Sequence, residues 1–128
     1  ITQRGKKHII AQEYVDAAKK GDNRLTFINY ELLPKKLIRL ASDRDFRGNL
    51  AVGATSKVED ISDSDRDIAA KITPYLRENK IYFAGADLLG NKLSEINFTS
   101  PTCLQEIHRG SDINPGTFFW DNLKEKKN

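Results

Sequence analysis

Residues 81–103 read IYFAGADLLGNKLSEINFTSPTC, and this stretch decides the fold. The apolar run Ile81–Leu89 is typical of a buried strand. Gly90 and Asn91 supply a turn, and Lys92–Phe98 returns as a second strand. The sequence therefore predicts an antiparallel hairpin over these residues.

Three oxygen-bearing side chains stand on this hairpin, namely Asp87, Glu95 and Asn97. Glu95 and Asn97 are two residues apart, so they project from the same face of their strand. Two carboxylates and an amide oxygen suit Mg²⁺, which prefers oxygen ligands and shares its coordination shell with phosphates. Acidic residues on an edge hairpin are usually just solvated, and that alternative stays open. Asp87 nevertheless lies in an apolar run, where an unpaired carboxylate is costly, and this favours a metal site.

The register of the hairpin tests that assignment. A plain two-residue turn would place Asp87 opposite Ser94, and Asp87 would then point away from Glu95 and Asn97. A shared site requires an odd connection, such as a three-residue loop or a β-bulge in either strand. Asp87 should then lie opposite Glu95, and Gly85 opposite Asn97.

The rest of the chain is predicted as strands and helices on either side of the hairpin. Apolar and β-branched runs predict the strands, and capping residues with helical spacing predict the helices. We expect strands at 8–14, 24–30 and 32–40, followed by a loop at 41–61. A helix should begin near Ser62 or Ser64 and be kinked at Pro74. After the hairpin we expect an elbow at 99–102 with Ser100 or Thr102 as the N-cap, a short helix through His108, and a last helix at 116–126. A loop of this length is usually a functional lid or disordered.

Two short segments near the start of the chain could contact a nucleotide. Gln12, Glu13 and Tyr14 end a predicted strand, where backbone N–H and C=O groups can meet a purine edge. In the following turn, Asp22 could accept from a sugar hydroxyl and Arg24 could hold a phosphate or carboxylate. The same residues are equally an ordinary Asx-type turn.

Arginines cluster at the start of the predicted loop, at Arg39, Arg44 and Arg47. One interpretation is a solvated loop. The other is a mobile basic flap over an anionic small molecule.

Composition excludes several classes of protein. The 128 residues carry 21 Lys+Arg and 18 Asp+Glu, a net charge of +3 with alternating signs, so no basic stripe for nucleic acid is present. No apolar run approaches the ~20 residues of a membrane helix. The single cysteine, Cys103, can form neither an internal disulfide nor a zinc knuckle. We expect a cytoplasmic protein.

The remaining reactive or aromatic side chains are interpreted as structural. Cys103 should pack near the start of a helix. His8 and His108 have no partner at catalytic spacing. The aromatic residues 118–120 are expected in the core.

Taken in order, five motifs resemble the C-terminal part of bacterial glutathione synthetase, an ATP-grasp ligase. The motifs are Ile10-Ala11-Gln12-Glu13-Tyr14, Gly21-Asp22-Asn23-Arg24, Arg47-Gly48-Asn49-Leu50-Ala51, Gly85-Ala86-Asp87, and Glu95-Ile96-Asn97-Phe98-Thr99-Ser100-Pro101-Thr102-Cys103. The resemblance extends from about Ile9 to about Trp120. It implies an α+β fold, the ATP-grasp C-terminal subdomain, with an antiparallel sheet packed with helices. It also implies that residues 1–128 are the C-terminal part of an ATP-grasp domain with a large flexible loop at about 41–61. The lack of methionine agrees with a fragment of a longer chain.

The resemblance implies a role for each matched residue. The metal ligands are Asp87, Glu95 and Asn97; the adenine and ribose contacts are Gln12, Glu13, Tyr14 and Asp22; Arg24 and Arg39 face phosphate and substrate; Arg47 and Asn49 lie in the closing loop; Ser100 and Thr102 grip a substrate carboxylate. Ala54–Lys57 depart from the glycine- and arginine-rich pattern of that loop.

The implied reaction joins γ-glutamylcysteine and glycine through an acyl phosphate, with ATP and Mg²⁺, or Mn²⁺ in its place. The family's phosphate-gripping lysines precede the matched region, so we expect the isolated chain to be inactive and the complete enzyme to be a homo-oligomer. Two alternatives stay open. One is another ATP-grasp peptide ligase, and the other is an inactive fragment or interaction module.

Overall fold

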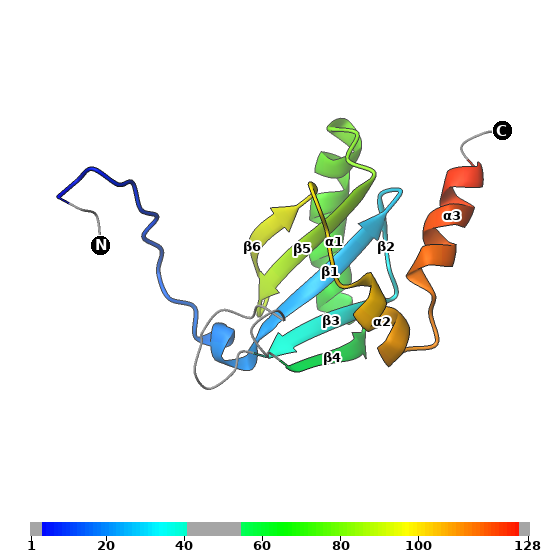
Figure 1. The fold of residues 1–128 in the computed structure, drawn as a ribbon, viewed down its shortest axis with the longest axis horizontal. Coiled ribbons are helices and arrows are strands. Elements are labelled where there is room, and N and C mark those ends of the chain that lie inside the picture. Colours follow the sequence, from blue (N-terminus) through cyan, green and yellow to red (C-terminus); the bar gives the residue numbers. More distant parts are fainter. Residues whose placement is uncertain (1–3, 41–54, 126–128) are drawn as a thin grey trace.

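One antiparallel sheet organises the chain and carries helices on both of its faces (Figure 1). The computed structural model describes residues 4–40 and 55–125. In chain order the elements are the 3-10 helix η1 (Asp16–Lys20), β1 (Asp22–Ile28), β2 (Glu31–Leu32), β3 (Lys35–Leu40), β4 (Thr55–Asp60), α1 (Asp63–Glu78), β5 (Phe83–Leu89), β6 (Lys92–Asn97), α2 (Leu104–Gly110) and α3 (Pro115–Glu125). The sheet order is β4-β3-β1-β5-β6, and β2 pairs with β1. The predicted α+β class is confirmed.

Alternation along the strands divides the core between the two faces of the sheet. Leu25 and Phe27 of β1 pack with α1 residues such as Ile72 in one apolar cluster. Ile28 and Leu37 belong to a second cluster, which includes α2 and is covered in part by aromatic side chains of α3. Because neighbouring strand residues point to opposite faces, the polar side chains described below lie on the face that carries α2 and α3.

The start of α1 is fixed by a capping box. The Ser62 hydroxyl accepts from the Asp65 backbone N–H at 3.2 Å, and Asp65 Oδ2 accepts from the Ser62 backbone N–H at 2.9 Å. The same Oδ2 accepts from Lys36 Nζ at 2.7 Å, and both residues are buried. The predicted helix start is confirmed, and one helix runs through Pro74. Helix N-caps of this kind satisfy backbone N–H groups that have no partner within the helix.

Several predictions about local structure are wrong. Residues 8–14 form no strand and are exposed, because no described strand pairs with them. The strand predicted at 32–40 is divided before Lys35, since Pro34 has no N–H to donate. The predicted loop contains β4, a polar edge strand whose stability comes from backbone pairing with β3 rather than from an apolar pattern.

Two expectations for the C-terminal helices also need correction. The N-cap of α2 is Cys103, at φ 84°, and no side chain caps the helix, so neither Ser100 nor Thr102 has that role. Phe118 and Phe119 pack against the second core cluster, but Trp120 is 63% exposed. Cys103 is buried in that cluster, as predicted. Within the described ranges, every helix is too short or too polar to cross a membrane.

Candidate metal and anion site

A β-bulge sets the register of the β5–β6 hairpin. Asp87 lies opposite Glu95 and Gly85 opposite Asn97, while Leu88 pairs with Leu93, so Ser94 is the extra residue of the bulge. The Ser94 hydroxyl donates to the Asp87 carbonyl oxygen at 2.9 Å. The predicted register is confirmed, and it brings Asp87, Glu95 and Asn97 to one face of the sheet.

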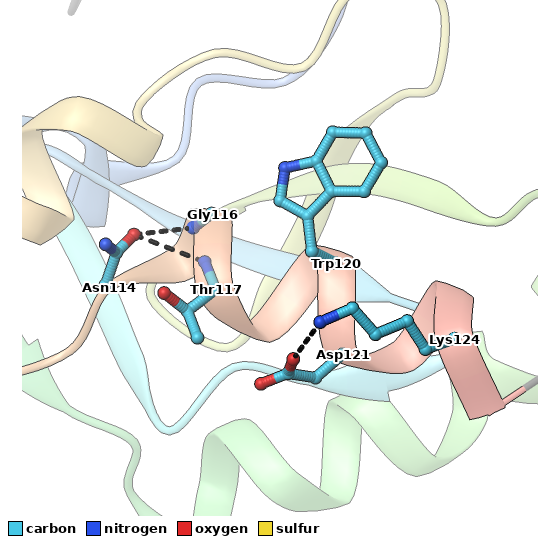
Figure 2. Close-up of a pocket in the computed structure, with 6 residues that line it drawn as sticks. All are labelled: Asn114, Gly116, Thr117, Trp120, Asp121 and Lys124. Atoms are coloured by element: carbon cyan, nitrogen blue, oxygen red, sulfur yellow. Dashed lines mark hydrogen bonds and ion pairs between the residues drawn. The ribbon is translucent and has the colours of Figure 1, made fainter.

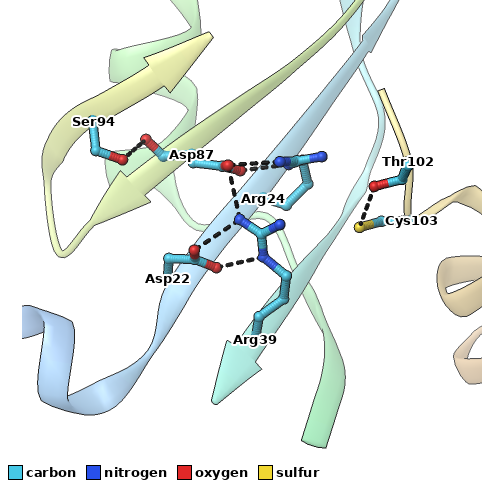
Figure 3. Close-up of polar contacts among 7 residues, drawn as sticks. All are labelled: Asp22, Arg24, Arg39, Asp87, Ser94, Thr102 and Cys103. Carbon is cyan, nitrogen blue, oxygen red and sulfur yellow. Dashed lines mark hydrogen bonds and ion pairs between the residues drawn. The ribbon is translucent and has the colours of Figure 1, made fainter. Parts of the chain in front are cut away.

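Four charged side chains form a continuous chain of ion pairs across β3, β1 and β5 (Figure 3). Arg24 lies opposite Asp87 and Asp22 lies opposite Arg39, so each pair is a direct cross-strand pair. Arg24 donates through Nε to Asp87 Oδ1 and through Nη2 to Asp87 Oδ2, the second contact measuring 2.6 Å. Arg39 donates to both oxygens of Asp22, at 2.6 and 2.7 Å, and its Nη2 lies 2.8 Å from Asp87 Oδ2. Such fork-shaped pairs fix both side chains in direction as well as distance.

The ion pairs outweigh the electrostatic cost of burial. Burial by itself lowers the pKa of a guanidinium group because it penalises the charged form. For Arg24, the hydrogen bond and charge of Asp87 reverse this and leave the pKa raised. For Arg39, burial is likewise outweighed by the hydrogen bond to Asp22 and the charges of Asp87 and Asp22, so its pKa is also raised. Both arginines are therefore held as cations beside the proposed metal ligands.

Two glycines lie where a Cβ would collide with the Arg24 side chain or with the Arg39 backbone. A Cβ on Gly85 would lie 2.9 Å from Arg24 Cδ, so the bare backbone of Gly85 forms the floor under the Arg24 side chain. A Cβ on Gly21 would lie 2.3 Å from the Arg39 carbonyl oxygen, and Gly21 has φ 89°. Only glycine fits such close approach at positive φ.

The remaining predicted ligands lie at the exposed side of this cluster. Glu95 is exposed and has no ion-pair partner among the described residues. Asn97 Oδ1 accepts from the Ser100 backbone N–H at 3.2 Å. Thr102 is exposed, and its hydroxyl lies 3.5 Å from Cys103 Sγ. The hydrogen bond between Ser100 and Asn97 therefore connects the elbow at residues 99–102 directly to the end of β6.

The segment predicted to meet adenine lies beside the tip of the same hairpin. A pocket of about 410 Å³ is lined on one side by residues of the N-terminal segment and η1 and on the other by the β5–β6 tip. Its lining residues are Gln12, Glu13, Tyr14, Val15, Ala18, Leu89, Lys92, Leu93 and Ser94. The structure therefore places the Gln12–Tyr14 segment beside the hairpin tip although no strand forms at 8–14, and none of Asp87, Glu95 and Asn97 lines this pocket.

Comparison with known proteins identifies the family of the chain. Residues 1–112 match the family described as "Prokaryotic glutathione synthetase, ATP-grasp domain". The chain belongs to this family.

Relatives named "Glutathione synthetase" include proteins from Pseudomonas aeruginosa, at 41% identity over 96% of this chain and 39% of that protein, and from Buchnera aphidicola, at 41% identity over 91% and 36%. The protein of that name from Synechococcus elongatus is 40% identical over 90% of this chain and 35% of its own length. The chain spans less than half the length of the relatives it matches.

In this ATP-grasp chain, a divalent metal would be bound by two kinds of oxygen ligand, carboxylates and a side-chain amide. No group of three or more His, Cys, Asp or Glu side chains that could hold a metal occurs in residues 4–40 and 55–125. Asp87 and Glu95 supply two carboxylates, and Asn97 supplies an amide oxygen from the same face. Mg²⁺ is commonly held by one or two carboxylates together with phosphate oxygens and water. The donor set therefore fits a metal that arrives with a phosphate-bearing ligand.

The remaining predicted site residues, Arg47 and Asn49, lie outside the described residues. Sequence reasoning missed two roles, that of Ser94 as the bulge residue and that of Gly85 in contact with Arg24. Ser94 could have been found from the register argument, which demanded a bulge without locating it. The contact between Gly85 and Arg24 had no sequence signal, because it depends on the pairing of β1 with β5.

A second hollow lies on α3, beyond the residues that match the glutathione synthetase family (Figure 2). It has a volume of about 530 Å³ and is lined by Asn114, Gly116, Thr117, Trp120, Asp121 and Lys124. Asn114 Oδ1 accepts from the backbone N–H groups of Gly116 and Thr117, at 2.9 and 3.3 Å, and so caps the helix. Lys124 Nζ lies 3.5 Å from Asp121 Oδ1. These polar groups partner one another, and none belongs to the ion-pair chain.

Proposed function

We propose that the chain forms the metal- and nucleotide-facing part of an ATP-dependent carboxylate–amine ligase, a glutathione synthetase. Its substrates are then γ-glutamylcysteine and glycine, joined through an acyl phosphate. Family membership and the printed name of the relatives support this proposal. The chain corresponds to 39% of the Pseudomonas aeruginosa protein, so a complete ligase is expected to supply further phosphate-binding groups.

The observation that carries the proposal is the hairpin register beside two buried arginines. Asp87, Glu95 and Asn97 share one face because of the bulge at Ser94, and Arg24 and Arg39 flank Asp87. A phosphoryl transfer to a carboxylate brings two anions together, and cations must offset that repulsion. A sheet face with this set of charges is suited to that task.

Individual residues receive roles in this scheme. When bound, Mg²⁺, or Mn²⁺ in its place, offsets the negative charge of the ATP phosphates. Asp87, Glu95 and Asn97 would hold it. Arg24 and Arg39 would orient the transferring phosphoryl group and the substrate carboxylate through their planar N–H donors.

The other groups orient the substrates. Gln12, Glu13 and Tyr14 line the pocket beside the hairpin tip, where adenine would bind. Asp22 orients Arg39 through two hydrogen bonds and would lie near the ribose. Ser100 and Thr102, on the exposed elbow, would contact a substrate carboxylate, while Arg47 and Asn49 would belong to the closing loop.

Counting the ADP released by a complete ligase that carries this sequence tests the proposal. We expect ADP release with γ-glutamylcysteine plus glycine, and little when simple dipeptides replace γ-glutamylcysteine. Glu95→Gln should remove that release, whereas Glu78→Gln, an exposed glutamate on α1, should not. Equal ADP release with simple dipeptides would instead assign the chain to another ATP-grasp peptide ligase. No ADP release with any acceptor would contradict a ligase role.

A further inference from the structure

The carboxylate at the centre of the proposed metal site is already held by two cations. Arg24 binds both oxygens of Asp87, and Arg39 Nη2 lies 2.8 Å from Asp87 Oδ2. A carboxylate offers about four lone-pair positions, so three guanidinium contacts leave little of it open to a metal. Asp87 is 5% exposed, which keeps water from competing for these contacts.

The charges of the ion-pair chain balance. Asp22 and Asp87 carry two negative charges, and Arg24 and Arg39 carry two positive charges. A divalent cation that entered alone would place two more positive charges beside two guanidinium groups. Either the metal is repelled or a guanidinium leaves Asp87, and a buried guanidinium that leaves needs another anion.

Arg24 already presents an unused donor. Its side chain is 4% exposed, and its Nη1 has no hydrogen-bond partner in the part of the chain that the structure describes. Figure 3 shows this end of the guanidinium pointing away from Asp87, to the side on which Thr102 and Cys103 lie. Buried N–H donors normally have a partner, and phosphate or carboxylate oxygens fit the guanidinium fork. An oxyanion beside Arg24 would supply the acceptor that Nη1 lacks.

We propose that Arg24 and Arg39 make divalent-cation binding at Asp87 conditional on an oxyanion ligand. Without the oxyanion, the two guanidinium groups occupy Asp87 and exclude the metal. When a phosphate-type oxyanion binds, the guanidinium groups donate to its oxygens, and Asp87 becomes available as a metal ligand. This inference rests on the proposed function, because it takes Asp87 as a metal ligand. In addition, the metal and the oxyanion stabilise each other's binding, because both guanidinium groups change partners.

The test is a titration of the purified chain with Mn²⁺ alone, followed by the electron paramagnetic resonance signal of free Mn²⁺. The titration is repeated with sulfate, a tetrahedral dianion, replacing chloride at constant ionic strength. We expect sulfate to tighten Mn²⁺ binding by about fivefold or more in the unmodified chain. Arg24→Gln should bind Mn²⁺ alone about fivefold more tightly than the unmodified chain and should lose the sulfate effect. Arg66→Gln is the matched control, because it removes one exposed positive charge from α1, on the opposite face of the sheet.

Two results would overturn the inference. In the first, sulfate leaves the Mn²⁺ affinity of the unmodified chain unchanged or lowers it. The other is a folded Arg24→Gln chain whose Mn²⁺ affinity equals that of Arg66→Gln. If Arg24→Gln does not fold, the sulfate effect in the unmodified chain decides, together with Arg24→Lys, which keeps the charge and should keep weak binding of Mn²⁺ alone.

Failure of the inference is distinguishable from failure of the proposed function. If Mn²⁺ binding depends on Glu95 but is not coupled to sulfate, only the proposed exchange of guanidinium partners is refuted. If Glu95→Gln leaves Mn²⁺ binding unchanged, the proposed metal site is refuted, and the proposed exchange of partners is refuted with it.

Discussion

Asp87→Asn should destabilise the folded chain far more than loss of a surface carboxylate does. The amide keeps one acceptor oxygen but turns an N–H₂ group toward guanidinium donors, so contacts with Arg24 are lost. Arg39 retains Asp22, but Arg24 has Asp87 as its only ion-pair partner among the described residues. Breaking a buried ion pair from one side costs about 3–5 kcal/mol. With an unfolding entropy of about 2.1 cal/mol/K per residue over 128 residues, Tm should fall by roughly 10–20 °C.

Thermal unfolding followed by circular dichroism, in buffer with a chelator, measures this loss. Glu95→Gln is the matched control, since Glu95 is exposed and its substitution should change stability by less than about 0.5 kcal/mol. The double variant Arg24→Gln/Asp87→Asn should lose less than the sum of the single variants, because it leaves no unpaired guanidinium on β1. A Tm for Asp87→Asn within about 2 °C of that for Glu95→Gln would refute the reasoning.

Three further predictions follow from the same structure. In a complete enzyme with the proposed ligase activity, Glu95→Gln should lower kcat by about 100-fold or more while the Tm stays unchanged, because the proposed metal ligand loses its charge. A near-normal kcat would remove Glu95 from the proposed site. Gly21→Ala should cost at least about 2 kcal/mol in urea unfolding, since its Cβ would lie 2.3 Å from the Arg39 carbonyl oxygen; an unchanged midpoint would contradict the close approach. Burial raises the pKa of Asp65, but hydrogen bonds from Lys36 and Ser62 outweigh it and leave the pKa lowered. The stability that Asp65 adds is therefore present above its unfolded pKa of about 3.9 and is lost as pH falls through the lower folded value. The difference in unfolding free energy between the unmodified chain and Asp65→Asn should thus shrink below about pH 4, and a difference that grows on acidification would contradict the assignment.

The sequence predicted those elements whose stability is local or strongly patterned. The hairpin and β1 have apolar residues on the face that packs against α1. The start of α1 is indicated by the capping residues Ser62 and Asp65. β4 was not predicted because its polar residues carry no burial pattern, and only its backbone pairing with β3 holds it. Conversely, Ile9 and Ile10 suggested a strand, but both are exposed, at 53% and 88%. An apolar pair forms a strand only where a neighbouring strand accepts it.

The candidate site shows the same division. The two-residue spacing of Glu95 and Asn97 sufficed to place them on one face, and the need for a bulge followed from the register. The ion pairs could not be predicted, because Arg24 and Asp87 are 63 positions apart and meet only through the β1–β5 pairing. The direction in which Trp120 points depends on how α3 sits on the sheet, and helical spacing alone could not decide it.

Asp65 also couples unwinding of the first turn of α1 to its separation from the sheet. Its Oδ2 accepts at once from the Ser62 backbone, the Ser62 hydroxyl and Lys36 Nζ of β3. Helix ends ordinarily fray independently of the rest of a protein. Here the first turn of α1 cannot unwind without also releasing a buried ammonium group from the sheet, so fraying and undocking become one cooperative step. Backbone amides near Asp65 should therefore exchange with solvent deuterium only when the whole sheet opens, while those near Glu78 exchange through local openings.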